Sequence, residues 1–132
     1  MKPRLHAQIS ARRWGGEPEE YQHLHDFFDQ TKAHLADVRH RAILHNAWGI
    51  FLLEQVYGTH FINSAGKEVS VRDVGEQHVI DDLGRIPPLQ ECIKDLPHQD
   101  WYGGPVRGKK ILTPEQLAEK FNRIKREQGL ID

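Results

Sequence analysis

Cysteine is nearly absent from this chain, which has one, Cys92, among 132 residues. A single cysteine excludes an internal disulfide and a zinc site built from cysteine thiolates. The longest uninterrupted apolar run near the centre covers residues 47–53, far short of the roughly 20 residues that a membrane-crossing helix needs. The N-terminus also lacks the apolar segment of a secretory signal. These absences predict a cytoplasmic protein that does not span a membrane.

Basic residues gather at the N-terminus, although the charges of the whole chain nearly cancel. The net charge is -1, with 28% charged and 38% hydrophobic residues. This composition suits one domain with a modest core, and it gives no overall attraction to nucleic acid. Residues 1–16 contain four basic residues and no acid, and they end in Trp14-Gly15-Gly16. We expect an irregular basic N-terminal arm here, because paired glycines interrupt regular structure.

Histidine stands out in the composition, with nine copies, six of them between His23 and His60. Histidine is the commonest metal ligand and the usual acid or base near neutral pH. Many histidines are instead solvent-exposed or hydrogen-bonded in a core. The enrichment alone therefore does not distinguish a metal or acid–base site from exposed or structural histidines.

The stretch from Asp37 to Gly58 is predicted to form one long central helix. Its first residue is a suitable N-cap, and its last is a suitable C-terminal stop. From Ile43 onward apolar side chains point in most directions, so other elements should bury this helix on several sides. A polar residue such as His45 would then need partners, because an unpaired buried polar group is costly. Gly49 lies on the same stripe, where we expect close approach of another backbone or a ligand.

The rest of the chain predicts further helices and one hairpin. The helices are expected over residues 19–35, 73–84, 89–96 and 113–128, and the hairpin over residues 59–71. The fold class is therefore α+β, mainly α, with a long buried central helix, packed helices and one β-hairpin. We divide the chain into the basic arm (1–16), a globular helical core with the hairpin (17–96), and a loop with a C-terminal amphipathic helix (97–132).

Histidines and carboxylates share helical faces at two places. His25 and Asp29 are four residues apart, and His78 and Asp81 are three apart, so each pair can point at one site. Asp82, next to Asp81, is turned from it by about 100° and is the weaker member. The favoured metal ligands are His45, His78 and Asp81, and the weaker candidates are His25, Asp29 and Glu54. His40 is a poor joint ligand with His45, because five residues separate them on the predicted helix.

Three blocks carry a family resemblance. They are RHRAILHNAWGIFLLEQVYG (39–58), INSAGKEVSVRDVGEQHVIDDLG (62–84) and RIPPL (85–89). The chain resembles a family of small uncharacterised bacterial and phage or prophage proteins, a domain of unknown function, over roughly residues 20–90. The pattern GEQHV...DLG-IP is its most specific part. Relatives tend to carry Ser or Thr where this chain has Pro88. The resemblance implies kinship and no mechanism, and it leaves the tail after Leu96 as an addition with its own partner surface.

Two functions from different classes compete. The first is a small non-catalytic binding or regulatory module of phage or prophage type, because no nucleophile constellation is present. In that case His45 is hydrogen-bonded to Glu76, His78 or Asp81. The module would be a homo-oligomer or bind a protein partner through residues 97–132.

The alternative is a metal-dependent hydrolase. It would hold a divalent transition metal between the central helix and the helix over residues 72–84, since histidines and carboxylates without cysteine suit such an ion. No HExxH motif supports it. A third hypothesis, nucleic-acid binding, would use the N-terminal arm and the last helix. It has less support, because acidic residues dilute the basic face of Lys120, Arg123, Lys125 and Arg126.

Overall fold

The computed structural model describes residues 1–103 and 113–129. Contacts between Cα atoms divide the chain into two compact units, Met1–Asp95 and Leu96–Asp132. The described residues form seven α-helices and one two-stranded antiparallel sheet. The predicted fold class, α+β and mainly α, is therefore confirmed. No helix among these residues is long and apolar enough to cross a membrane.

The N-terminal residues form a helix, α1 (Pro3–Trp14), so the prediction of an irregular arm is wrong. Proline in the first turn suits the start of a helix, and Gly15 ends it with a φ of 88°. The buried side of α1 carries His6, Ala7 and Ser10. Two of these three residues are polar, so the helix lacks the apolar periodicity by which a buried face is recognised.

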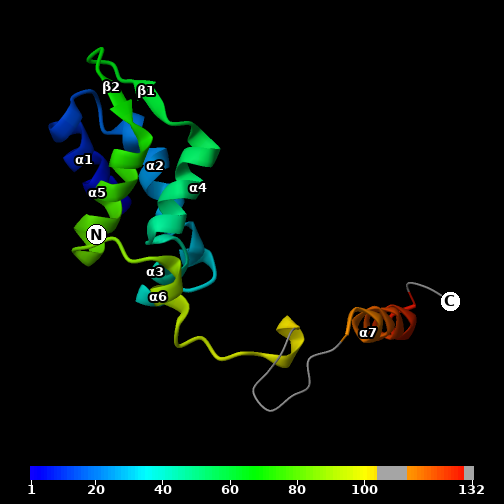
Figure 1. Cartoon of the computed structure of the whole chain (residues 1–132). Coiled ribbons are helices and arrows are strands. Elements are labelled where there is room, and N and C mark those ends of the chain that lie inside the picture. The colour runs from blue at the N-terminus through cyan, green and yellow to red at the C-terminus, as the bar shows by residue number, and fades with distance from the viewer. Residues whose placement is uncertain (104–112, 130–132) are drawn as a thin grey trace. The chain divides into compact units, whose positions relative to one another are not determined.

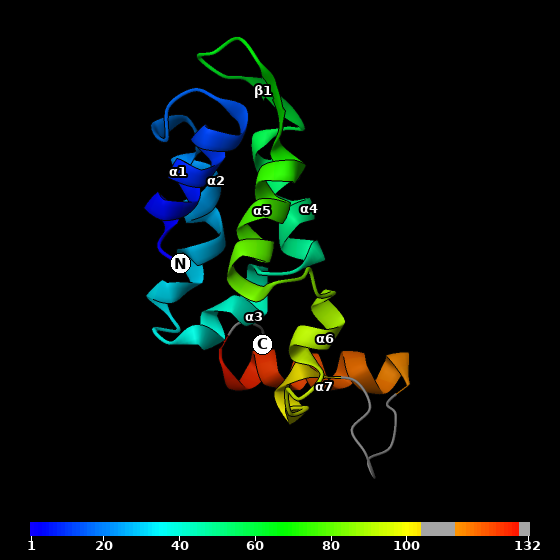
Figure 2. The same cartoon turned by 90° about the vertical axis from the view of Figure 1, so that its left-hand side faces the viewer.

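Helix α2 (Glu19–Asp29) packs alongside α1, as Figures 1 and 2 show. It is shorter than the predicted helix over residues 19–35, because a 3₁₀ turn, Gln30–Ala33, follows it. Tyr21, Leu24 and Phe28 place its apolar stripe in the core. His25 and Asp29 are buried on the same helix.

The predicted central helix is broken in two at His45 and Asn46. A 3₁₀ turn (Val38–His40) leads into α3 (Arg41–Leu44), and α4 (Ala47–Tyr57) follows the break. Asn46 is extended, and its side chain accepts a 2.9 Å hydrogen bond from the Gly49 backbone N–H. This N-cap starts a new helix where the periodicity predicted continuation. A Cβ on Gly49 would lie 1.7 Å from the Leu44 carbonyl oxygen, which confirms the predicted close approach of a backbone.

Helix α4 is buried on one side only, which corrects the expectation of a helix covered all round. Ile50 and Leu53 face the core. Trp48, Phe51 and Val56 are 41%, 53% and 61% exposed. An apolar helix face is therefore open to solvent in the first unit.

The hairpin consists of β1 (His60–Ile62) and β2 (Glu68–Ser70), with His60 paired to Ser70. This confirms the hairpin predicted over residues 59–71. Helix α5 (Val71–Leu83) follows directly, and it begins at Ser70 as N-cap rather than at Asp73.

Helix α5 contacts α1, α2 and α4, so its buried face meets all three. Helix α6 (Leu89–Ile93) completes the first unit and packs on α3. In the second unit, a 3₁₀ turn (Asp100–Tyr102) precedes α7 (Pro114–Glu127). Helix α7 starts with the predicted capping box of Thr113 and Gln116. The predicted loop over residues 98–110 lies partly outside the described residues.

Candidate metal centre

Three segments bring histidines and carboxylates together in the first unit. Helix α2 contributes Asp29, and α5 contributes His78 and Asp82, which lie on one face because they are four residues apart. His45 comes from the break between α3 and α4, where the backbone leaves helical geometry with a φ of -79° and a ψ of 60°. The Asn46 N-cap that breaks the central helix therefore also sets the position of His45.

These four residues each offer one ligand atom, and the four atoms lie within 4.8 Å of one another. The Nε2 atoms of His45 and His78 are 3.2 Å apart. Asp82 Oδ2 is 3.0 Å from the first and 3.4 Å from the second. Asp29 approaches them with Oδ1 at 3.6 Å from His45 and Oδ2 at 3.9 Å from His78. Four donor atoms from three segments thus lie close enough together to surround one ion.

The site is enclosed by protein. The side chains of His45, His78 and Asp82 are fully buried, and that of Asp29 is 7% exposed. Asp29 Oδ2 is buried without a hydrogen-bond partner in the structure. Two imidazoles and two carboxylates, without sulfur, form a donor set that suits zinc and similar divalent transition ions.

The protonation states suit a cation. Burial opposes the charge on Asp82, but hydrogen bonding from His45, the nearby His6 and the Met1 amine outweigh burial and hold the pKa of Asp82 well below its usual range. Burial, with the neighbouring His6, lowers the pKa of His78 well below its usual range. At neutral pH the site therefore offers an ionised carboxylate and a neutral imidazole, the forms that bind metals.

A second group of nitrogens, from His6, His25 and His78, also lies within 4.8 Å. The rings of His6 and His78 stack, with their centroids 3.9 Å apart and an angle of 28° between their planes. A metal ion binds in the plane of an imidazole ring, and stacked rings direct their nitrogens side by side rather than at one point. This group fits ring packing, and the first group is the candidate metal centre.

The structure places the predicted pair His45 and His78 in direct contact. The carboxylate beside them is that of Asp82, whereas Asp81 lies outside the converging group, and metal binding by these residues stays a prediction. Asp81 Oδ2 lies 3.3 Å from His6 Nδ1 and accepts a hydrogen bond from Gln77. On a helix Asp81 and Asp82 lie about 60° and 40° to opposite sides of His78. The direction from which the other helices pack decides between them.

The other predicted candidates have different surroundings. Asp29 belongs to the converging group, and its Oδ1 also lies 3.1 Å from Nε2 of His40. His25 contacts the other ring nitrogen of His78, with the two Nδ1 atoms 2.9 Å apart. Glu54 belongs to neither group of donors found among the described residues, and it lines a separate cavity with Arg72.

Sequence reasoning missed His6 and Ser10 because both lie in the segment predicted to be irregular. Ser10 Oγ is 2.7 Å from Nε2 of His25. Pro3 and Gly15 were the available signals, since proline near the start and glycine just past the end bracket a helix. No apolar pattern accompanied them.

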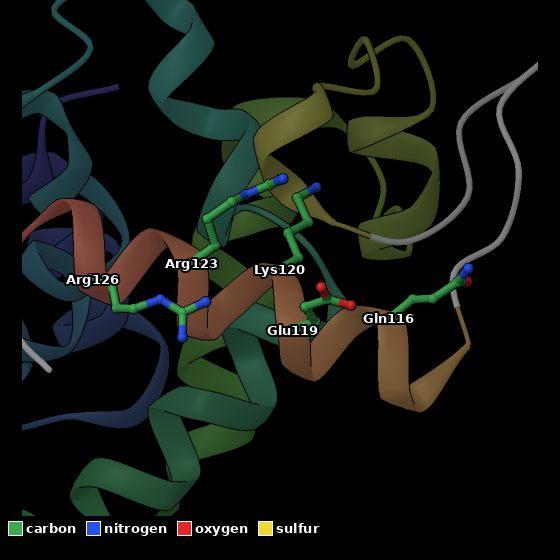
Figure 3. A pocket seen from close by; sticks show the side chains of 5 residues that line it. All are labelled: Gln116, Glu119, Lys120, Arg123 and Arg126. Atoms are coloured by element: carbon green, nitrogen blue, oxygen red, sulfur yellow. The ribbon is translucent and has the colours of Figure 1, made fainter. Parts of the chain in front are cut away.

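A separate cavity of about 270 Å³ lies along α7 in the second unit. Figure 3 shows the side chains that line it: Gln116, Glu119, Lys120, Arg123 and Arg126. The acidic Glu119 interrupts the three basic residues. This mixture does not form the uninterrupted basic surface that favours phosphate binding.

A family model described as "Domain of unknown function (DUF6915)" matches residues 1–102. No curated protein and no solved structure matches the chain significantly. The match includes α1 and every residue of the candidate centre, and it extends further toward both ends than the resemblance noted over residues 20–90.

Proposed function

The chain belongs to the DUF6915 family, and we propose that it is a small non-catalytic binding module whose buried centre holds one divalent transition metal ion. The observation that carries this proposal is the convergence of four ligand atoms from Asp29, His45, His78 and Asp82 within 4.8 Å. Two buried carboxylates that approach each other repel unless a cation or protons lie between them. A metal ion would replace this repulsion by four bonds that join α2, α5 and the break before α4.

The burial of the ligands supports a structural or regulatory ion rather than a hydrolytic one. A catalytic metal site keeps a coordination position open for water or substrate. Here three of the four side chains are fully buried and the fourth, Asp29, is 7% exposed. We therefore favour the module over the metal-dependent hydrolase.

Elemental analysis of the full chain, purified without a histidine tag, tests this proposal. We expect about one equivalent of zinc or a similar transition metal per chain. Chelation should lower the melting temperature, and added Zn²⁺ should restore it, because an ion that binds only the folded state stabilises it. A metal-free protein whose melting temperature is unchanged by Zn²⁺, Co²⁺ or Ni²⁺ would contradict the proposal.

We further propose a second copy of this chain as the partner of the exposed face of α4. Phe51 lines a cavity of about 270 Å³, and Trp48 is exposed on the same helix. Glu54 of α4 lies at this cavity with Arg72 and Glu76 of α5, and Arg72 Nε donates to Glu76 Oε1 at 3.1 Å. A twofold axis through the cavity would place the Glu54 carboxylate of each copy near the Arg72 guanidinium of the other copy.

The Phe51→Asp substitution should convert a dimer into a monomer, because it places a charge in the apolar centre of this interface. Analytical ultracentrifugation of the full chain measures this. Ile62→Asp is the matched control, since Ile62 is 66% exposed but lies on the hairpin. A wild-type protein that stays monomeric at about 100 μM, or a Phe51→Asp variant that stays dimeric, would contradict the interface.

The remaining expectations from the sequence stay predictions. They are a regulatory role of phage or prophage type, a cytoplasmic location and a protein partner for residues 97–132. The charged face of α7 supports a protein partner more than a nucleic acid, because Glu119 lies among its basic residues. A pull-down with the second unit alone would require that unit to fold independently, so the full chain is the material to use.

A further inference from the structure

A chain of hydrogen bonds runs from Gln77 to the candidate metal centre. The Gln77 amide nitrogen donates to the His6 carbonyl oxygen at 3.1 Å and to Asp81 Oδ2 at 3.0 Å. A carbonyl oxygen can only accept, so the His6 carbonyl fixes which end of the Gln77 amide faces it. The amide oxygen of Gln77 therefore points the other way, toward Ser10.

Ser10 lies between Gln77 and His25 and contacts both side chains. Its Oγ is 2.6 Å from the Gln77 amide oxygen, which is an acceptor, so the hydroxyl proton must point there. A serine hydroxyl has one proton. The contact at 2.7 Å between Ser10 Oγ and His25 Nε2 therefore requires His25 to donate. The alternative hydroxyl direction, toward the His6 carbonyl at 3.1 Å, would leave two bare oxygens 2.6 Å apart.

His25 then fixes the tautomer of His78. His25 is fully buried between the Ser10 hydroxyl and another imidazole, so the neutral ring is its favourable form. A neutral ring that carries its proton on Nε2 has a lone pair on Nδ1. This Nδ1 lies 2.9 Å from Nδ1 of His78, so His78 must carry its own proton there. The Nε2 lone pair of His78 is thereby directed toward His45, Asp29 and Asp82.

We propose that Gln77, Ser10 and His25 are positioning residues that preset His78 Nε2 as a metal ligand and so make the centre selective for imidazole-binding transition ions. This rests on the proposed function and deepens it, since it names the residues that fix which nitrogen of His78 faces the ion. Zn²⁺, Co²⁺ and Ni²⁺ accept imidazole nitrogen readily, whereas Mg²⁺ and Ca²⁺ prefer oxygen. The chain of hydrogen bonds follows the known pattern in which outer residues fix the tautomer of a ligating histidine.

Nuclear magnetic resonance of the metal-free full chain tests the tautomers directly. Long-range ¹H–¹⁵N correlation spectra identify which ring nitrogen of each histidine carries the proton. We expect His78 protonated on Nδ1, the opposite of the form that free histidine prefers, and His25 protonated on Nε2. A spectrum with the proton of His78 on Nε2 would overturn the inference.

The Ser10→Ala variant tests the connection between the hydrogen bonds and the ion. It should abolish the single tautomer of His78 and weaken Zn²⁺ binding by up to about tenfold, the lower end of the effect of removing an outer partner, because Ser10 acts on His78 only through His25. Ser10→Thr keeps the hydroxyl and should keep the tautomer. Ser64→Ala is the control, because Ser64 is exposed on the hairpin. Unchanged Zn²⁺ affinity in folded Ser10→Ala would contradict the positioning role.

The two proposals fail in different ways. The expected tautomers in a protein that binds no transition metal would refute the metal-binding function and leave the preset lone pair established. Tight Zn²⁺ binding with His78 protonated on Nε2 in the metal-free protein would refute the positioning role of Gln77, Ser10 and His25. It would still support the metal centre. Equal affinities for Zn²⁺ and Mg²⁺ would refute the selectivity.

Discussion

Replacing Asp82 by asparagine is expected to weaken Zn²⁺ binding by about 100-fold. A structural zinc ion contributes about 10–16 kcal/mol, so one ligand of four accounts for roughly 3 kcal/mol, or about 100-fold in Kd. Asp82 Oδ2 lies within 3.4 Å of both imidazole Nε2 atoms, and the amide of asparagine supplies no negative charge. Competition with a chromophoric chelator measures the change.

Asp81→Asn is the matched control. It removes the same charge one residue away, but Asp81 contacts His6 and Gln77 and lies outside the four converging ligands. We expect a loss of less than about tenfold, as for an outer partner at the weaker end. Circular dichroism checks that both variants fold. Equal losses in the two variants would mean that Asp82 has no special role, and an unchanged affinity in Asp82→Asn would exclude it as a ligand.

The metal-free protein is expected to lose stability steeply as the pH falls below 6.5. Burial, with the neighbouring His6, lowers the pKa of His25 from 6.5 to about 3. Between these values the unfolded chain binds a proton that the folded chain does not. The stability is therefore fully present above pH 6.5 and declines by about 1.4 kcal/mol per pH unit for each such histidine.

His78 shares this behaviour, because its pKa is lowered in the same direction and also mainly by burial. Two protons give a limiting decline of about 2.7 kcal/mol per pH unit, or about 3 kcal/mol between pH 6.5 and 5 because the unfolded histidines are only half protonated at pH 6.5. That is a large part of the 5–15 kcal/mol that stabilises a typical domain. Besides burial, His6 and Asp82 act on the pKa values of both rings, His23 acts on that of His25, and His25 and His45 act on that of His78. The pKa of Asp82 is lowered too, and its contribution is lost only below about pH 4, outside this range.

Urea unfolding at pH 7.5, 6 and 5, in the presence of a chelator, measures this decline. His25→Gln should reduce the slope by about half, since one of the two protons is removed. His60→Gln should leave it unchanged, because His60 is exposed. A free energy of unfolding that is flat from pH 7.5 to 5 would show that the buried histidines do not resist protonation.

Local features of the fold could be predicted because local chemistry determines them. Gly58, Gly84 and the capping box at Thr113 mark helix ends through backbone conformation and nearby hydrogen bonds. The break at Asn46 could not be predicted in this way. Asparagine is tolerated within a helix and favoured at an N-cap, so its presence does not decide between a continuous helix and a new helix start. The close approach of Gly49 to the Leu44 carbonyl, seen only in the structure, shows that a new helix starts here.

The candidate centre was half predictable. His45 and His78 stood out as polar residues in buried segments, and the structure brings their Nε2 atoms to 3.2 Å. The choice between Asp81 and Asp82 depends on a rotation of α5 that α1, α2 and α4 determine together. His6 was missed because its buried face of α1 is polar. Its partners come from α5, more than 70 residues away in sequence.

X-ray absorption spectroscopy of the zinc-loaded full chain tests the central claim most directly. The ligands Asp29, His45, His78 and Asp82 predict four nitrogen or oxygen neighbours at about 2.0–2.2 Å, no sulfur, and outer-shell scattering from two imidazoles. Asp82→Asn should weaken this signature at limiting zinc. A coordination shell that lacks imidazole, or one unchanged when His45 and His78 are both replaced, would show that the ion binds elsewhere and would contradict the account.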